Sequence, residues 1–189
     1  MFDYINSFNN IVHSIIENNI KNKNIAIDAT LGNGYDTDFL KDRFSKVYSF
    51  DIQEKAVNSY KKKSIHNVEV ILDSHEYFNK YISNDIKIDC IVYNLGYLPG
   101  SDKSITTKKE STIKSIEIAL QLLNENGLIL IAMYPGHEEG LKEKEEVLKL
   151  AKKLNVREYG VLYQEFINRP NNPPCLIIIE KNNSWSLCK

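Results

Sequence analysis

A short apolar run that ends in polar residues carries the clearest chemical signal in this sequence. It spans residues 89–100 and reads DCIVYNLGYLPG, with Asn94 and Tyr97 three positions apart. The Asn side-chain oxygen and a neighbouring carbonyl, here that of Leu95, can accept the two N–H hydrogens of an amine, which aims the nitrogen lone pair outward. The Tyr ring can then cover a flat or cationic substrate. This spacing predicts chemistry on nitrogen; the alternative is that Asn94 and Gly96 only form a strand-to-turn connection.

A glycine turn lies upstream of this run. Residues 25–37 read IAIDATLGNGYDT, an apolar stretch followed by Gly32 and Gly34 and then by Asp36 and Thr37, which can cap the next helix. Glycines let the backbone approach a ligand closely, and a helix start offers N–H groups to an anion. Thr37 occupies the third position of the dinucleotide fingerprint G-x-G-x-x-G, where Gly or Ala is required, and this disfavours NAD. The turn is therefore interpreted as a binding loop for another nucleoside cofactor.

Two further strand-like runs also end in polar residues. The run KVYSFDI ends at Asp51, roughly 20 residues after the glycine turn, where a carboxylate can accept hydrogen bonds from both ribose hydroxyls. The run VEVILDSHE ends in Asp73, Ser74 and His75. Strands of a parallel sheet that end in polar residues bring these side chains to one edge, where ligands of such folds bind. We therefore expect the ligand site at the carboxyl edge of a parallel sheet.

The apolar periodicity predicts strands and helices in alternation after an amphipathic helix over residues 3–20. The predicted strands are 25–30, 46–51, 68–72, 88–94, 127–133, 159–164 and 175–180, and the predicted helices are 36–44, 53–63, 75–82, 111–124 and 138–154. Alternation of this kind indicates an α/β fold with a doubly wound parallel sheet. Residues 164–174 are too few and too rich in Pro and Asn for a crossover helix, so the last two strands should pair antiparallel.

Length and charge limit the functions that the chain can have. Its 189 residues suit one domain, so we expect a single domain over 1–189 with residues 1–21 as an amphipathic helix packed on it. No signal peptide or membrane segment is indicated, which predicts a cytoplasmic protein. Cys90 and Cys175 fall in apolar runs without a C-x-x-C pair, which predicts buried free thiols and no metal site. The formal net charge of -1 disfavours broad nucleic-acid binding, so any RNA contact must be local.

Several segments together resemble a known family. DATLGNGYDT, FDIQ around Asp51, LDSHE and NLGYLPGSDK are similar to the putative rRNA methylase family of class I S-adenosylmethionine-dependent methyltransferases, and the resemblance extends from about Ile25 to Lys181 through IAMYPGHEEG and INRPNNPPCLIIIEK. NLGYLPG is the specific element, whereas the glycine loop is shared by all class I methyltransferases. Leu31 and Ser101 depart from the family pattern of Met and Gly.

The resemblance implies a Rossmann-like sheet of seven strands, mostly parallel, with an antiparallel carboxyl-terminal strand. It implies S-adenosylmethionine as cofactor and the tRNA anticodon stem-loop as partner, without membrane or metal, and it leaves a homodimer open. The implied activity is tRNA modification: N-methylation of the 5-aminomethyl group of the wobble uridine, which gives 5-methylaminomethyl-2-thiouridine.

Site residues follow from the motifs and from this resemblance. Asn94 and Tyr97 are the catalytic candidates. The cofactor candidates are Asp28, Thr30, Gly32, Asn33, Gly34, Asp36, Thr37, Asp51, Gln53, Asp73, Ser74, His75 and Asn94. The substrate candidates are Leu95, Gly96, Pro99, Gly100, Lys103, Tyr134, His137 and Arg169.

Some of these roles have plain structural alternatives. His75 and His137 can act as proton acceptors, although a histidine beside the cofactor more often shapes the adenine pocket. Tyr134 and His137 line the substrate mouth or only form a turn. Lys103, Lys108, Lys109, Lys114 and Arg169 hold RNA phosphates or form a solvated face.

Other functions also stay open at this point. One is methylation of an exocyclic base amine in rRNA or DNA, and another is a non-catalytic protein that binds a nucleoside cofactor. A nicotinamide oxidoreductase would use the glycine loop and Asp51 but gives no role to Asn94 and Tyr97.

Overall fold

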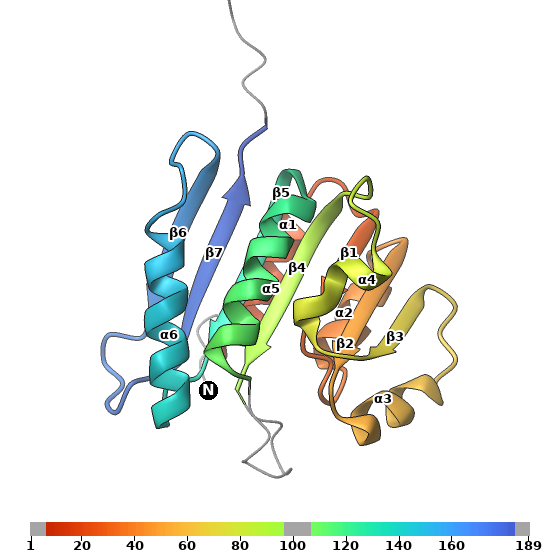
Figure 1. Ribbon diagram of the computed structural model, residues 1–189, viewed down its shortest axis with the longest axis horizontal. Coiled ribbons are helices and arrows are strands. Elements are labelled where there is room, and N and C mark those ends of the chain that lie inside the picture. Colours follow the sequence, from red (N-terminus) through yellow and green to blue (C-terminus); the bar gives the residue numbers. More distant parts are fainter. Residues whose placement is uncertain (1–6, 97–106, 184–189) are drawn as a thin grey trace, which may run out of the picture.

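Seven strands form one sheet in the computed structural model, which describes residues 7–96 and 107–183 (Figure 1). The strand order is β3-β2-β1-β4-β5-β7-β6. The strands are β1 Ile25–Asp28, β2 Lys46–Asp51, β3 Val68–Leu72, β4 Ile88–Leu95, β5 Leu123–Met133, β6 Tyr159–Glu165 and β7 Cys175–Lys181. β1 to β5 pair in parallel, and β7 is antiparallel to both β5 and β6, so the predicted α/β sheet with a reversed last strand is confirmed.

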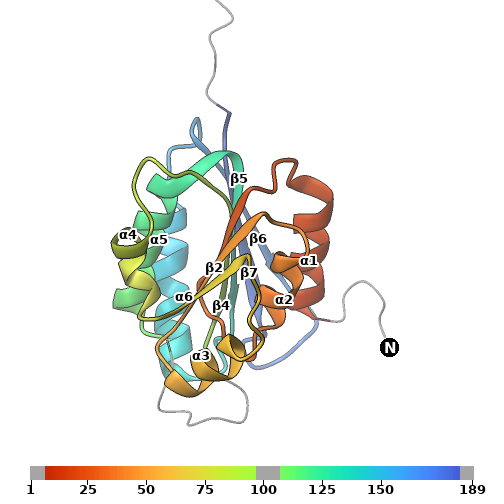
Figure 2. The ribbon, with the colours of Figure 1, turned by 90° about the vertical axis from the view of Figure 1, so that its right-hand side faces the viewer.

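Helices cover both faces of the sheet (Figure 2). They are α1 Phe8–Asn19, α2 Tyr35–Lys41, α3 Glu54–Lys61, α4 Phe78–Tyr81, α5 Lys109–Leu122 and α6 Glu138–Ala151. α1 and α2 lie on one face, and α4, α5 and α6 lie on the other. α3 packs against β3 through Val57 and Tyr60. Because both faces are covered, β4 and residues 127–133 of β5 are buried almost throughout, as parallel strands covered on two sides must be.

The first helix confirms the amphipathic pattern within the described residues. Ser7 caps α1 by accepting a hydrogen bond from the backbone N–H of Asn10 at 3.4 Å. Phe8, Val12 and Ile16 lie at helical spacing and are buried against the sheet. α1 therefore docks on the sheet, and its first turn lies beside the carboxyl end of β4, where Asn9 reaches Asn94.

Two predicted helices differ in detail from the observed ones. α2 begins at Tyr35 and is capped by Gly34 in the left-handed region at φ 83°, not by Asp36 or Thr37. A Cβ atom at Gly34 would lie 2.4 Å from the Tyr60 ring, so this tight turn requires glycine. The predicted helix 75–82 is a 3₁₀ turn over His75–Tyr77 followed by the short α4.

The boundary between α5 and β5 is also shifted. The helix ends at Leu122 and the strand begins at Leu123, four residues before the expected start at 127. Asn126 has a φ of 58°, which lets the extended chain bend sharply at this point without a loop. The other boundaries differ from the expected ones by at most five residues at either end.

Three further features concern membrane-spanning helices, clusters of metal ligands and the cysteines. Among residues 7–96 and 107–183, no helix is long and apolar enough to cross a membrane. The same residues hold no group of three or more His, Cys, Asp or Glu that would bind a metal. Cys90 and Cys175 are buried free thiols, as predicted.

Candidate cofactor and substrate pocket

A pocket of about 1340 Å³ opens at the carboxyl edge of the sheet, the lower end in Figure 1. Its walls come from the ends of β1, β2, β3, β4 and β5 and from the loop that precedes β7. A volume above 1,000 Å³ exceeds that of common small-molecule sites, so it has room for a cofactor and part of a second molecule. The lining segments are residues 29–33, 35–36, 50–53, 73–76, 94–96, 107–108, 134, 136–137 and 169–174, with Asn9, Glu110, Ser111 and Lys114.

The glycine loop after β1 forms the floor of this pocket. Gly32 has a φ of 49°, and its N–H donates a 2.8 Å hydrogen bond to Oδ2 of Asp51 at the end of β2. The other carboxylate oxygen, Oδ1, accepts from the N–H of Gln53 at 2.8 Å. Each oxygen keeps a second lone pair, so Asp51 can still accept two hydroxyl hydrogens. Burial raises the pKa of Asp51, against the opposing effect of these backbone hydrogen bonds.

A buried polar cluster supports the loop from behind. Asp28 accepts hydrogen bonds from the Thr37 hydroxyl at 2.5 Å and from the Thr30 N–H at 3.1 Å, and Thr37 also contacts the Ser49 hydroxyl at 2.8 Å. Burial raises the pKa of Asp28, and the neighbouring carboxylate of Asp36 raises it further. Of the predicted cofactor residues, Asp28, Gly34 and Thr37 are absent from the pocket wall. Asp28 and Thr37 instead hold the loop in place.

The segment after β3 forms one side wall. Asp73 accepts hydrogen bonds from the Tyr81 hydroxyl at 2.9 Å and from Lys80 Nζ at 3.4 Å. His75 is buried with its ring 5.8 Å from that of Tyr93, and its Nδ1 has no hydrogen-bond partner among the described residues. Burial lowers the pKa of His75 to about 4, so the ring is neutral near pH 7. A low pKa makes His75 a poor proton acceptor, which favours its role as a wall of the pocket.

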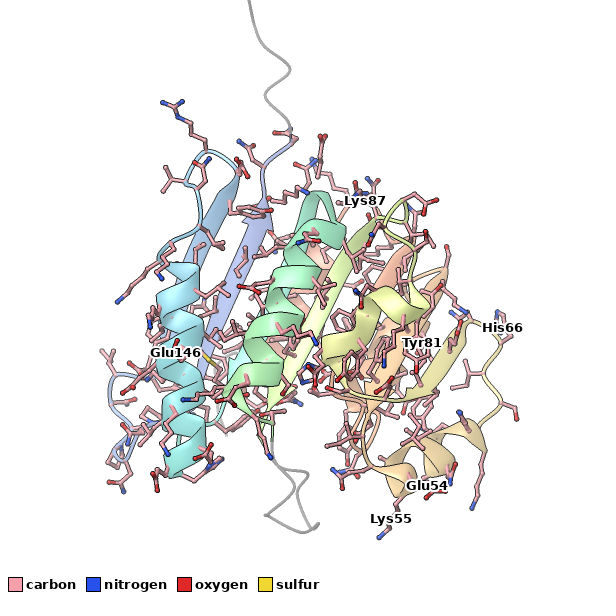
Figure 3. All side chains as sticks on the ribbon, viewed as in Figure 1. Glu54, Lys55, His66, Tyr81, Lys87 and Glu146 are labelled. Carbon is pink, nitrogen blue, oxygen red and sulfur yellow. The ribbon has the colours of Figure 1, made fainter. Side chains whose placement is uncertain are left out.

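The buried His75 predicts a pH-dependent stability. The folded-state pKa of about 4 lies below the ordinary value of 6.5, so the folded protein binds fewer protons than the unfolded chain between these values. The free energy of unfolding should therefore fall by about 3 kcal/mol as the pH drops from 6.5 to 4. Urea unfolding at several pH values would measure this slope, and His75→Gln should flatten it. The exposed His66 (Figure 3) provides the matched control, because His66→Gln should leave the slope unchanged; equal slopes in all three proteins would contradict the prediction.

Asn94 lies at the end of β4 inside the pocket. Its backbone N–H donates to the Thr30 hydroxyl at 2.8 Å. Its side-chain Nδ2 donates to Oδ1 of Asn9 and to Oδ2 of Asp36, both at 3.4 Å. A carboxylate can only accept hydrogen bonds, so the amide nitrogen must face Asp36. The Oδ1 atom of Asn94 is therefore the one left to accept hydrogen bonds from a ligand.

Gly96 and Thr107 bond to each other, and the buried carboxylate of Glu143 holds Thr107. The Thr107 N–H donates to the Gly96 carbonyl at 3.2 Å, and the Gly96 N–H donates to the Thr107 hydroxyl at 3.0 Å. Glu143 of α6 accepts from the hydroxyls of Thr107 at 2.9 Å and Thr112 at 2.6 Å. Burial raises the pKa of Glu143, while the two hydroxyl bonds oppose this rise. Glu143 thus fixes the position of Thr107. The predicted site residues Tyr97, Pro99, Gly100 and Lys103 lie outside the described residues.

Aromatic and basic side chains surround the mouth of the pocket. Tyr134 donates to Oδ1 of Asn9 at 3.4 Å, and Arg169 lies with its guanidinium 3.6 Å from the centre of the Phe166 ring. Lys114 forms an ion pair with Glu76 at 3.1 Å. His137 accepts from the Gly140 N–H at 3.1 Å and so caps α6, which is the turn role that the sequence left open, although it also lines the pocket. Lys109 pairs with Glu110 at 3.7 Å and is not among the lining residues.

The structure brings most of the predicted site residues to one pocket. These are Thr30, Gly32, Asn33, Asp36, Asp51, Gln53, Asp73, Ser74, His75, Asn94, Leu95, Gly96, Tyr134, His137 and Arg169. Sequence reasoning missed Asn9, Tyr35 and Ile52 on the wall, and it missed His13 behind it. Asn9 and His13 belong to α1, and no local pattern connects a helix near the amino terminus with the end of β4.

The strand order, the reversed β7 and a pocket at the carboxyl edge define the Rossmann-like fold of class I methyltransferases. The model of the family described as "Putative rRNA methylase" matches residues 47–180, and the chain belongs to this family.

Solved structures and a curated relative agree with this assignment. A protein from Clostridium thermocellum described as "putative rRNA-methylase" is 37% identical, with a TM-score of 0.88 over 95% of this chain and 100% of that one. A protein from Streptococcus mutans described as "a putative methyltransferase" in complex with SAH is 36% identical, with a TM-score of 0.82 over 96% of this chain and 99% of that one. A chloroplastic tRNA (mnm(5)s(2)U34)-methyltransferase of Arabidopsis thaliana is 28% identical over 92% of this chain and 69% of that protein.

Proposed function

We propose that this protein transfers a methyl group from S-adenosylmethionine to the nitrogen of the 5-aminomethyl group of the wobble uridine in tRNA. The product is 5-methylaminomethyl-2-thiouridine. The observation that carries the proposal is the orientation of Asn94, whose amide nitrogen is held by Asn9 and Asp36 so that Oδ1 can accept from an amine. The name of the Arabidopsis thaliana relative, which specifies mnm(5)s(2)U34, supports this choice of substrate.

The cofactor is S-adenosylmethionine, as the family and the SAH complex of the Streptococcus mutans relative indicate. The residues of this chain fit it. The backbone at Gly32 carries no side chain toward the pocket, and Asp51 offers free lone pairs at the end of β2, where ribose hydroxyls are bound in such folds. Ile52 and His75 supply apolar and neutral surface for a base. When bound, the cofactor supplies an electrophilic methyl group on a sulfonium.

The protein's part in the reaction is mainly to position a free amine. Oδ1 of Asn94 and the carbonyl of Leu95 accept the two N–H hydrogens, so the lone pair points toward the methyl group. Correct alignment of two reacting groups in a pocket can supply most of the lowering of the barrier, and no covalent nucleophile is needed. The covering role of Tyr97 stays a prediction.

The basic residues at the mouth are proposed to hold the phosphates of the RNA. Lys108 and Lys114 at the start of α5 and Arg169 in the loop before β7 all line the pocket. The net charge of -1 makes such a local patch necessary, because the whole surface does not attract RNA.

The phosphate contacts predict a change in salt dependence. Replacing Lys108, Lys114 and Arg169 together by glutamine should raise the KM for tRNA and reduce the slope of log affinity against log salt by about 0.7 to 1 for each phosphate that is no longer neutralised. Cofactor affinity should not change. The control removes three charges far from the pocket: Lys87, at the opposite end of β4 in Figure 3, and the exposed Lys152 and Lys153 after α6. An equal reduction of the slope in both triple variants would show that RNA binds elsewhere.

Nucleoside analysis tests the substrate directly. A strain that lacks this protein should accumulate 5-aminomethyl-2-thiouridine in its tRNA, and the purified protein with S-adenosylmethionine should convert that nucleoside to the methylated form. Methylation of an exocyclic base amine in rRNA or DNA, with unchanged tRNA nucleosides, would favour the competing substrate class. Cofactor binding without any methylated product would indicate a non-catalytic binding protein.

A further inference from the structure

A line of polar contacts leads from the pocket to the outer surface through α2 and α1. Asp36 contacts Asn94 through Oδ2 at 3.4 Å and contacts Nε2 of His13 through Oδ1 at 2.7 Å. The side chain of Asp36 is 7% exposed and that of His13 is 23% exposed. One carboxylate therefore lies between the proposed amine site and an imidazole that reaches solvent.

The His13 ring is held in a fixed orientation. It stacks on Phe39 of α2 with ring centres 3.8 Å apart and planes 7° apart. The Arg43 guanidinium lies 3.8 Å from the centre of the same Phe39 ring and pairs with Glu17 of α1. The His13–Phe39 stack and the Arg43–Glu17 pair both connect α1 with α2 and the residues that follow it. These contacts keep Nε2 of His13 directed at Asp36.

We infer that Asp36 accepts the proton which the substrate ammonium must lose, and that the Nε2–H of His13 orients the Asp36 carboxylate for this transfer. The inference rests on the proposed function, because an aliphatic aminomethyl group is largely protonated near neutral pH and cannot attack in that form. Asp36 is assigned a catalytic role because it faces the reacting nitrogen, and His13 is a positioning residue that acts through Asp36. The contact between Asp36 and Asn94 places the proton acceptor beside the proposed amine site at Oδ1 of Asn94.

The proton and electron balance is simple. The ammonium gives one proton to the Asp36 carboxylate, and the freed lone pair forms a bond to the methyl carbon as the carbon–sulfur bond breaks. The electrons of that bond stay on sulfur, which becomes a neutral thioether, and the product is a secondary ammonium. The Nε2–H of His13 stays donated to Oδ1 of Asp36 throughout, and the proton on Oδ2 passes to water after the product leaves, so each turnover releases one proton.

The other titratable groups around Asp36 do not compete for this role. Asp28 lies behind the loop, Cys90 lies within β4, and Tyr134 lies at the pocket mouth. Burial, with the charge of Asp36 as a further cause, raises the pKa of each of these three groups. Cys90 and Tyr134 therefore stay protonated at neutral pH, and the fully buried Asp28 has no contact with the pocket.

The test compares single-turnover rates between pH 6 and 9 on tRNA that carries the aminomethyl nucleoside. Asp36→Asn keeps the shape of the side chain but cannot take a proton, so the rate at pH 7 should fall about a hundredfold, within the range usual for proton transfer. It should then recover steeply toward pH 9, as free amine becomes available in solution, while the wild-type rate changes little. The single-turnover rate of His13→Gln at pH 7 should fall about tenfold and should also rise toward pH 9.

Two controls separate this role from a structural one and from cofactor binding. Glu69→Gln breaks an exposed ion pair with Lys46 that lies outside the pocket and outside the contacts between α1 and α2, and its rate and pH profile should match wild type. SAH affinity measured by calorimetry should change less than about threefold in Asp36→Asn, within the scatter expected for a residue that makes no hydrogen bond to the ligand. A loss of SAH affinity of tenfold or more would instead make Asp36 the cofactor ligand that the sequence suggests, and would overturn the inference.

The outcomes also distinguish this inference from the proposed function. If wild-type protein methylates the tRNA and Asp36→Asn follows the same pH profile, the proton route is wrong and the function stands. If wild-type protein binds SAH but does not methylate this tRNA, the proposed function is wrong and the inference falls with it.

Discussion

Replacing Asn94 by alanine is expected to lower the rate of methyl transfer more than a hundredfold while tRNA still binds. The reason is that Oδ1 orients the nitrogen lone pair, an interaction that matters most in the transition state, so its loss should appear in kcat rather than in KM. The amide is fixed by Asn9 and Asp36 before substrate arrives, so no binding energy is spent on ordering it. Single-turnover assays with saturating cofactor measure the chemical step directly.

Two further variants sharpen this experiment. Asn58→Ala removes the same side chain from the exposed face of α3, outside the pocket, and should behave as wild type. Asn94→Asp keeps the acceptor oxygen but places a second carboxylate against Asp36, so like-charge repulsion should displace it and most of the activity should be lost. A wild-type rate for Asn94→Ala would show that this stretch of β4 is only a strand-to-turn connection.

The topology could be read from the sequence because it depends on local and repetitive features. Apolar runs at strand spacing and the short link before residue 175 were enough to predict a parallel sheet with a reversed last strand, and the register confirms both. The polar residues at the ends of β2 and β3 could be placed in one site, because parallel strands share an edge.

The parts that the sequence did not predict depend on contacts between distant segments. Asp36 looks like a helix cap in the sequence, yet Gly34 caps the helix and Asp36 pairs with His13, 23 positions earlier. Glu143 lies in the stretch KEKEEVLKLAKK of residues 142–153, whose charged composition is typical of an exposed helix, yet it is 3% exposed. A signal was present, because Glu143 lies four residues before Val147 and eight before Ala151, on the apolar stripe of α6.

Removing the carboxylate of Asp51 is expected to weaken binding of S-adenosylmethionine more than a hundredfold. Loss of the hydrogen bonds from two ribose hydroxyls to a charged acceptor should weaken the binding free energy by on the order of 3 kcal/mol, which corresponds to that change in affinity. Asp51→Ala also removes the acceptor of the Gly32 and Gln53 N–H groups, so part of the loss comes from the loop itself. Asp51→Asn keeps one acceptor oxygen and should fall between wild type and Asp51→Ala.

Calorimetry with SAH and S-adenosylmethionine can separate these contributions. Asp85→Ala removes an exposed carboxylate far from the pocket and serves as the control, with wild-type affinity expected. Burial raises the pKa of Asp51, and ribose hydroxyls donate to its ionised form, so wild-type affinity should decrease as the pH is lowered toward that pKa. Asp51→Asn has no carboxylate to protonate and should lose this pH dependence. Equal affinity of Asp51→Ala and wild type would place the ribose elsewhere and would leave Asp51 only the task of holding the glycine loop.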